Sequence, residues 1–188
     1  MRPQNDKHCK GINCEELHLS NTFRRLWSEH VLWTRFFIVS TTFSLPDLPV
    51  VTQRLLRNPV DFANVLRPFY GTQIAARFEE LLTEHLVIAA QLVNAAKAGD
   101  TAEVEILRRK WYANAEEIAC FLAQINPFWS EREWRDLLFD HLCMTEAEAV
   151  EMLSGQYEES IREFDAIQAE ALVMADVMSC GIIKQFCV

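Results

Sequence analysis

The stretch from Leu92 to Leu107, LVNAAKAGDTAEVEIL, decides the fold of this chain. Apolar residues recur at helical spacing both before and after Gly99 and Asp100, and only these two residues break the helical pattern. Glycine is common at the end of a helix, and Asp100 followed by Glu103 has the spacing of a capping box that begins the next helix. A two-residue turn between two long helices predicts an antiparallel helical hairpin.

The hairpin belongs to a larger pattern of four long segments, each with one apolar stripe at helical spacing. We therefore predict an all-α protein, a four-helix up-and-down bundle with short helices inserted in the first and third connections. Residues 1–19 are expected to be a flexible N-terminal tail, and residues 20–188 a single helical domain. The long helices are predicted at 20–43 (with Ser20 as N-cap), 72–98, 101–125 and 156–184. The short helices are predicted at 47–57, 58–69 (with Asn58 as N-cap), 131–142 and 147–153, the last begun by the capping pair of Thr145 and Glu148.

Composition and charge exclude several classes of partner. The formal net charge is −9, so the surface as a whole should repel nucleic acid and anionic membranes. No stretch was expected to span a membrane; residues 36–51 come closest, but two prolines and an aspartate interrupt them. The N-terminus lacks the apolar core of a secretory signal. We expect a cytoplasmic protein with neither nucleic-acid nor membrane partners.

A polar layer is predicted at the middle of the bundle. The segment LWSEHVLWTR, residues 26–35, places His30 in an apolar stripe, and His85 interrupts another stripe in the same way. His85 and Asn114 lie equally far from the turn, so they should face each other at one level. The residues expected to bind a ligand in this layer are His30, His85, Asn114, Gln168, Thr34 and Trp111.

Three interpretations of this layer stay open. Imidazoles of His30 and His85 on neighbouring helices can share a transition metal, or a haem with the tryptophans as its walls. The same residues can bind a small polar ligand, with His85 as a general base if the protein is an enzyme. Alternatively, the layer is a hydrogen-bonded device that fixes the register of the helices in the bundle, and the protein is a structural or regulatory homo-oligomer. Neither histidine has a second metal ligand on its own helix face.

Two further clusters are candidate sites. His8, Cys9, Cys14 and His18 lie close enough together in sequence to bind zinc, although their spacing fits no common zinc motif. Arg35, Arg54 and Arg57 are candidates for anion binding, and the alternative is that they form ion pairs with the acidic bundle. His141 is predicted at the end of a short helix, where its charge suits a helix C-terminus.

Several segments resemble a known family: LWSEHVLWTR, LPDLPVVTQRLLRNPVDFANVLRPFYG, LLTEHLVIAAQLVNAAKAGD, NAEEIACFLAQINPFWSEREWRDLLFDHL and ADVMSCGIIKQF. They are similar to small helical proteins, mainly from Gram-positive bacteria, many of which carry the label acetylglutamate kinase. The resemblance covers residues 24–186. That label implies a larger α/β fold with glycine-rich phosphate loops, whereas this chain has five glycines and no strand pattern. Our leading expectation is a helical binding protein, with a small metabolite-acting enzyme as the alternative.

Overall fold

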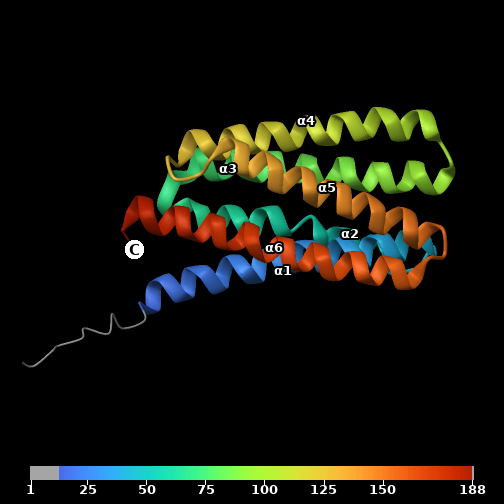
Figure 1. Ribbon diagram of the computed structural model, residues 1–188, viewed down its shortest axis with the longest axis horizontal. Helices are drawn as coiled ribbons and strands as arrows, with labels where there is room; N and C mark the ends of the chain where they lie inside the picture. Colours follow the sequence, from blue (N-terminus) through green and yellow to red (C-terminus); the bar gives the residue numbers. More distant parts are fainter. Residues whose placement is uncertain (1–12, 188) are drawn as a thin grey trace, which may run out of the picture.

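The computed structural model describes residues 13–187, and all regular structure within that range is helical (Figure 1). Long helices pack antiparallel, as predicted, and the hairpin of α3 and α4 lies beside a layer formed by α1 and α6. Helix α5 runs obliquely from α4 at one end toward α6 at the other. The helices are α1 (Cys14–Thr42), α2 (Leu48–Leu55), α3 (Asn58–Ala98), α4 (Thr101–Ile125), α5 (Glu131–Leu153) and α6 (Tyr157–Phe186).

The main difference from the predicted bundle is helix α5, which is one continuous helix where two short helices were expected. Thr145 and Glu148 were predicted to begin a new helix. Both side chains are instead buried inside α5, on the face that also carries His141 and Met152. Residues at this spacing share one side of a helix, so burial of that face keeps the helix continuous. The chain therefore has five long helices within residues 13–187.

The first helix begins earlier than predicted. Asn13 is its N-cap, and the Asn13 side-chain oxygen accepts a hydrogen bond from the backbone N–H of Glu15 at 3.0 Å. Ser20, the predicted N-cap, lies inside the helix. Of the predicted N-terminal tail, residues 14–19 are helical, and residues 1–12 lie outside the described part of the chain.

The turn residues behave as the sequence indicated. Gly99 adopts a left-handed conformation with φ 72°, and Asp100 accepts a hydrogen bond from the Glu103 backbone N–H at 3.0 Å. Ser130 caps α5 in the same way, through Glu133. Gly71, with φ 81° and ψ 172°, breaks α3 into two helical parts near the boundary predicted at residue 72.

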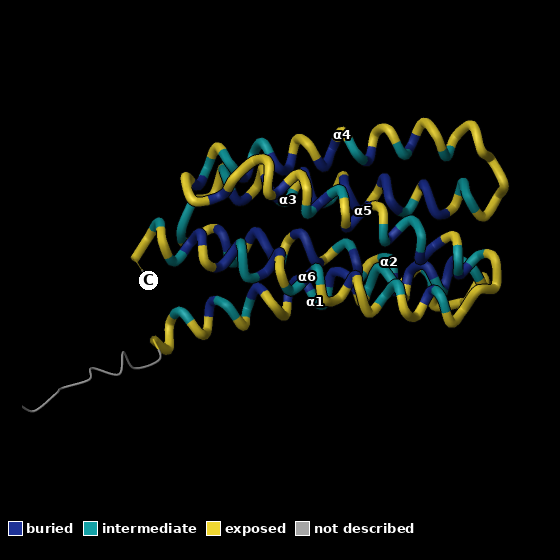
Figure 2. Tube along the Cα trace, viewed as in Figure 1, coloured by how far each residue is buried: buried dark blue, intermediate teal, exposed yellow. Residues whose placement is uncertain are grey.

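The core lies along the inward faces of the long helices, and the outward faces are exposed (Figure 2). Trp134, Phe23 and Phe62 are among the largest side chains that are completely buried. The core consists mostly of apolar residues along its whole length, so the buried polar groups described below are exceptions within it.

Helix α6 is long and apolar enough, by length and composition, to cross a membrane. An 18-residue window within it has a mean hydropathy of 1.5, so the prediction that no stretch is sufficiently apolar was wrong for this helix. In the structure, 44% of that window is buried, and it contributes Ile167, Met174 and Ile182 to the core. The core helix of a helical bundle meets the same criterion.

Gly181 of α6 packs directly against Trp129 in the loop before α5. A Cβ atom at this position would overlap the indole ring of the buried Trp129, whose Nε1 donates to the Val177 carbonyl oxygen at 3.1 Å. Because Trp129 is enclosed, we expect Gly181→Ala to destabilise the protein by about 2 kcal/mol in urea unfolding. The exposed neighbour Cys180→Ala is the control and should change stability little. Equal unfolding midpoints for the two variants would contradict this packing.

Candidate functional site

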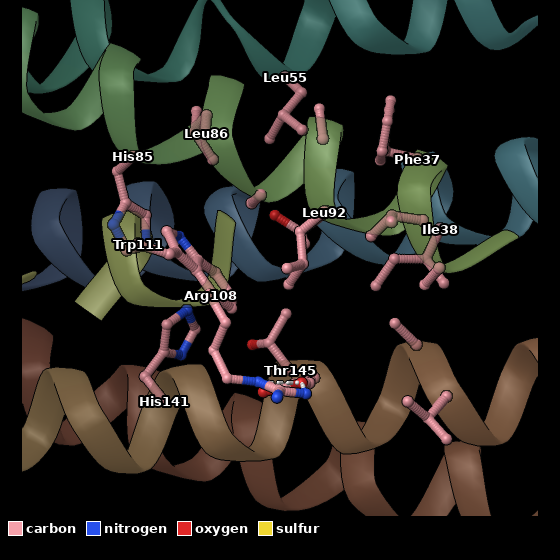
Figure 3. Close-up of a pocket in the computed structure, with 18 of the residues that line it drawn as sticks. Phe37, Ile38, Leu55, His85, Leu86, Leu92, Arg108, Trp111, His141 and Thr145 are labelled. Atoms are coloured by element: carbon pink, nitrogen blue, oxygen red, sulfur yellow. Dashed lines mark hydrogen bonds and ion pairs between the residues drawn. The ribbon is translucent and has the colours of Figure 1, made fainter. Parts of the chain in front are cut away.

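Three buried histidines from three helices meet at the middle of the molecule. His30 of α1, His85 of α3 and His141 of α5 are each at most 3% exposed. The ring centroids of His30 and His85 are 6.4 Å apart, and those of His30 and His141 are 5.7 Å apart. Figure 3 shows His85 and His141 reaching into one cavity from opposite walls. His30 and His85 were predicted in the polar layer, whereas His141 was predicted only at the end of a short helix.

Two of these histidines are held by asparagines in the same arrangement. Nδ1 of His30 lies 3.0 Å from Oδ1 of Asn58, and Nδ2 of Asn58 donates to the Leu26 carbonyl oxygen at 3.0 Å. On the other side of the cavity, Oδ1 of Asn114 lies 2.9 Å from Nδ1 of His85. Nδ2 of Asn114 donates at 3.1 Å to the carbonyl oxygen of Leu81, which precedes His85 by four residues as Leu26 precedes His30. His85 and Asn114 thus face each other as predicted.

These hydrogen bonds determine which ring nitrogen carries the proton. A backbone carbonyl only accepts, so the asparagine NH₂ faces it and the asparagine oxygen faces the histidine. Nδ1 of both His30 and His85 must therefore donate, which leaves the Nε2 lone pair of each neutral ring available. Burial, with the neighbouring imidazoles of His141 and His85, lowers the pKa of His30 to about 3. Burial and His141 lower the pKa of His85 to about 3 as well.

His141 has an acidic neighbour instead of an asparagine. Its Nδ1 lies 3.3 Å from Oε2 of Glu170 on α6, and the two side chains are 4% and 13% exposed. Neither carboxylate oxygen of Glu170 makes a hydrogen bond to another described residue. Nδ1 of His141 makes no hydrogen bond to a described residue either, so this pair leaves polar atoms unsatisfied at the closed end of the cavity.

A second buried acid, Glu148 on α5, is paired with an arginine. Glu148 accepts a hydrogen bond from Arg35 Nη1 at 2.6 Å, and the same nitrogen donates to the Ser160 carbonyl oxygen at 3.1 Å. Burial raises the pKa of Glu148 to about 7, because desolvation of the carboxylate outweighs the hydrogen bond and charge of Arg35. This pair connects α1, α5 and α6 through buried groups.

The histidines form the closed end of a channel of about 80 Å³ that follows the bundle axis. On α3 alone its lining runs from His85 to Ala96, about 16 Å of helix at 1.5 Å per residue. The same gradient appears on α1, α3, α4 and α5, while α2 contributes only Leu55 to the lining. Buried polar or aromatic residues line the closed end (His30, His85, Trp111 and His141), and aliphatic residues line the opposite end (Ile38, Ala96, Val104 and Val150).

The channel opens at its aliphatic end, where α4 and α5 diverge. Val150 is 49% exposed there, and Ala96 and Val104 are half-buried. Arg108 and Glu146 form an ion pair between α4 and α5 beside this mouth, with Arg108 Nε 2.7 Å from Glu146 Oε1. The opening is therefore mainly apolar with one neutralised pair of charges at its edge.

Two further polar atoms near the closed end have no hydrogen-bond partner within residues 13–187. They are Nε1 of Trp111 and Oγ1 of Thr145, and both residues line the channel. Buried polar groups in proteins are almost always paired, so unpaired donors that face a cavity indicate groups that a ligand or water satisfies. The channel thus offers indole and hydroxyl donors beside the imidazole lone pairs.

Of the other two predicted ligand-binding residues, Thr34 lines the channel and Gln168 does not. Thr34 lines the channel, but its hydroxyl donates to the backbone carbonyl of His30 at 2.8 Å. Gln168 lies on the exposed side of α6, so it is not part of the polar layer, and the neighbouring Ile167 occupies the core. The helix register that buries Ile167 and Ala171 turns Gln168 outward.

The predicted arginine cluster does not form one anion site. Arg54 pairs with Glu29 at 2.9 Å, and exposed Arg57 pairs with Asp61 at 3.2 Å. Arg35 is committed to Glu148, as described above. Each arginine already has a carboxylate partner, so the arrangement matches the alternative of ion pairs within the bundle. None of the three lines the channel.

The transition metal predicted between His30 and His85 stays a prediction. Within residues 13–187, no group of three or more histidine, cysteine or acidic side chains is arranged to hold a metal ion. A channel of about 80 Å³ is too small for a haem between His30 and His85. For the predicted zinc cluster, His8 and Cys9 lie outside the described residues, while Cys14 and His18 are exposed at the start of α1.

Sequence reasoning missed the contributions of α5, α6 and Asn58. Asn58 was predicted to cap a helix, but its side chain is completely buried against His30. The spacing of His141, Thr145 and Glu148 would have revealed a polar helix face if α5 had been treated as one helix. Nothing in the sequence singles out Glu170 among its many acidic neighbours.

Comparisons of the chain with protein-family models, with curated proteins and with solved structures find no match.

Proposed function

We propose that this protein binds a small amphipathic molecule in the channel, with the polar head of the molecule at the histidines. The observation that carries the proposal is the gradient of the lining, from buried polar groups at the closed end to aliphatic residues at the mouth. Ligand pockets are typically apolar, with a few convergent polar groups that fix orientation. The opposite ends of this channel match the opposite ends of such a ligand.

The polar end favours an uncharged head group. His30 and His85 offer Nε2 lone pairs, and Trp111 and Thr145 offer unpaired donors. A hydroxyl group donates and accepts, so it satisfies both kinds of partner. A carboxylate would be desolvated beside neutral acceptors and near the Glu170 carboxylate, with no free arginine in the channel to pair it. We therefore expect alcohols to bind and the corresponding acids to bind poorly.

The alternatives make different demands on this region. An enzyme that uses the arginines for an anion requires a pocket joining them to the histidines, and Arg35, Arg54 and Arg57 do not line the channel. A layer that only fixes packing requires His30 to be sealed by its neighbours, yet His30 lines the cavity. The channel supports ligand binding over both.

Calorimetric titration with the straight-chain alcohols from butan-1-ol to octan-1-ol tests the proposal on chelator-treated protein. Each added methylene is worth about 0.8 kcal/mol when buried, so affinity should rise about fourfold per methylene until the channel is full. Hexanoate should bind at least tenfold more weakly than hexan-1-ol, because its charge must be desolvated.

A matched pair of variants locates the binding. Ala149→Phe fills the aliphatic part of the channel, since Ala149 is buried and lines it. It should abolish the chain-length dependence, whereas Ala113→Phe on the exposed face of α4 should leave it intact. An affinity that is equal for all chain lengths, or unchanged by Ala149→Phe, would exclude the channel as the binding site.

A further inference from the structure

The closed end of the channel presents two hydrogen-bond donors and two acceptors to a ligand. The donors are Nε1 of Trp111 and Oγ1 of Thr145, which have no partner within residues 13–187 and belong to side chains at most 5% exposed. The acceptors are the Nε2 lone pairs of His30 and His85, because Nδ1 of each ring donates to an asparagine. Buried polar groups are normally paired, so a ligand that fills this end should pair with all four.

These four groups surround one small volume (Figure 3). The ring centroids of His85 and Trp111 are 5.3 Å apart, and those of His85 and His30 are 6.4 Å apart. Thr145 lies one helical turn from His141, whose ring centroid is 5.7 Å from that of His30. A head group of only a few atoms can therefore contact all four walls.

A primary carboxamide supplies the complementary set of atoms. Its carbonyl oxygen has two lone pairs for the two donors, and its NH₂ group has two hydrogens for the two acceptors. An alcohol has one hydrogen and leaves one imidazole lone pair unpaired, whereas a ketone leaves both unpaired. Hydrogen bonds of about 2.9–3.0 Å from the two hydrogens of one NH₂ group require acceptors roughly 5 Å apart. Two imidazole rings with centroids 6.4 Å apart accommodate that spacing.

We propose that the ligand of the channel is a short-chain primary aliphatic amide, with its carboxamide at the closed end and its alkyl tail along the aliphatic lining. The carbonyl oxygen accepts from Trp111 and Thr145, and the NH₂ group donates to His30 and His85. This inference rests on the proposed function and names the chemical class of its ligand. His141 takes no part in this pairing, because its Nδ1 lies beside the Glu170 carboxylate and no asparagine fixes its proton.

Calorimetric titration of the full chain with three ligands of similar length tests the inference. The ligands are hexanamide, heptan-2-one, in which a methyl group replaces the NH₂ group, and hexan-1-ol. Hexanamide makes two more hydrogen bonds than heptan-2-one, so it should bind at least about tenfold more tightly, and it should also bind more tightly than hexan-1-ol. Without these partners heptan-2-one should bind more tightly than hexanamide, because an amide is costly to desolvate.

A pair of threonine variants locates the head group. Thr145→Val removes an unpaired hydroxyl at similar side-chain size, and it should weaken hexanamide binding about fivefold. Thr34→Val is the matched control, because Thr34 lines the same channel but its hydroxyl already donates to the His30 carbonyl oxygen at 2.8 Å. The control should bind hexanamide with the affinity of the wild type. Helical circular dichroism confirms that both variants are folded.

The outcomes separate this inference from the proposed function. Hexanamide bound no more tightly than heptan-2-one, or bound equally by the wild type and Thr145→Val, overturns the inference. The proposed function survives that result if the affinity of the alcohols still rises with chain length. If neither the amide nor the alcohols bind, the proposed function and this inference are both rejected. The comparison of the three ligands uses only the wild type, so it decides the inference even if Thr145→Val does not fold.

Discussion

Lowering the pH from 7 to 3 is expected to destabilise the wild-type protein by about 4 kcal/mol more than a variant that lacks one of the buried histidine–asparagine pairs. The pKa of His85 is about 3 in the folded protein, against an ordinary value of 6.5. Between these values the unfolded chain binds a proton that the folded protein excludes, so stability falls as the pH falls. The slope is about 1.4 kcal/mol per pH unit for one such group.

The matched variant is the double substitution His85→Leu with Asn114→Leu, which removes both members of the pair. We measure its unfolding free energy in urea from pH 7 to pH 3. This free energy should fall less steeply than that of the wild type, by the contribution of one proton, about 1.4 kcal/mol per pH unit. Glu148 acts in the opposite direction in both proteins: its pKa of about 7 is raised, so it destabilises the fold as the pH rises from 4.5 to 7. Parallel curves would show that His85 is protonated or exposed in the folded protein.

Asn114→Leu alone is expected to cost about 2–4 kcal/mol in urea unfolding at pH 7. The substitution removes the acceptor of the His85 Nδ1–H and one donor to the Leu81 carbonyl. A buried donor left without a partner carries its full desolvation penalty, whereas replacing both partners by apolar groups can be nearly neutral. The single variant should therefore be less stable than the double variant with His85→Leu.

The control for this prediction is Asn94→Leu on α3. Asn94 also donates to a backbone carbonyl four residues earlier, Ala90 at 2.7 Å, but it is exposed. Water replaces that hydrogen bond, so the cost should stay below about 0.5 kcal/mol. A double variant that is no more stable than Asn114→Leu alone would mean that the histidine finds another partner.

Local signals in the sequence were sufficient to predict most of the helices and three members of the polar layer, His30, His85 and Asn114. The turn at Gly99 and Asp100 sets α3 and α4 side by side, so equal distances from it predicted that His85 faces Asn114. Hydrophobic stripes predicted the inward position of His30. These inferences depend only on helix geometry and on contacts within one hairpin or one helix face.

The remaining parts of the site depend on contacts between helices that are distant in sequence. Thr145 and Glu148 match a capping pair locally, and only their burial against other helices shows that α5 continues through them. Asn58 similarly matches an N-cap in the local sequence, but tertiary packing places its side chain in a hydrogen bond with His30. Gln168 lies one position from the buried Ile167, which is a rotation of about 100° around the helix, so the predicted apolar stripe of α6 was placed on the wrong side at this point.

The most direct test of the binding channel is a long-range ¹H–¹⁵N spectrum of the histidine rings, recorded on chelator-treated protein at pH 7 with and without hexan-1-ol. The structure predicts that His30 and His85 are neutral, with the proton on Nδ1. Saturable shifts of their Nε2 resonances on addition of hexan-1-ol, absent in Ala149→Phe, would place the ligand head at the histidines. Nε2 resonances that do not move at saturating hexan-1-ol would contradict binding at this end of the channel.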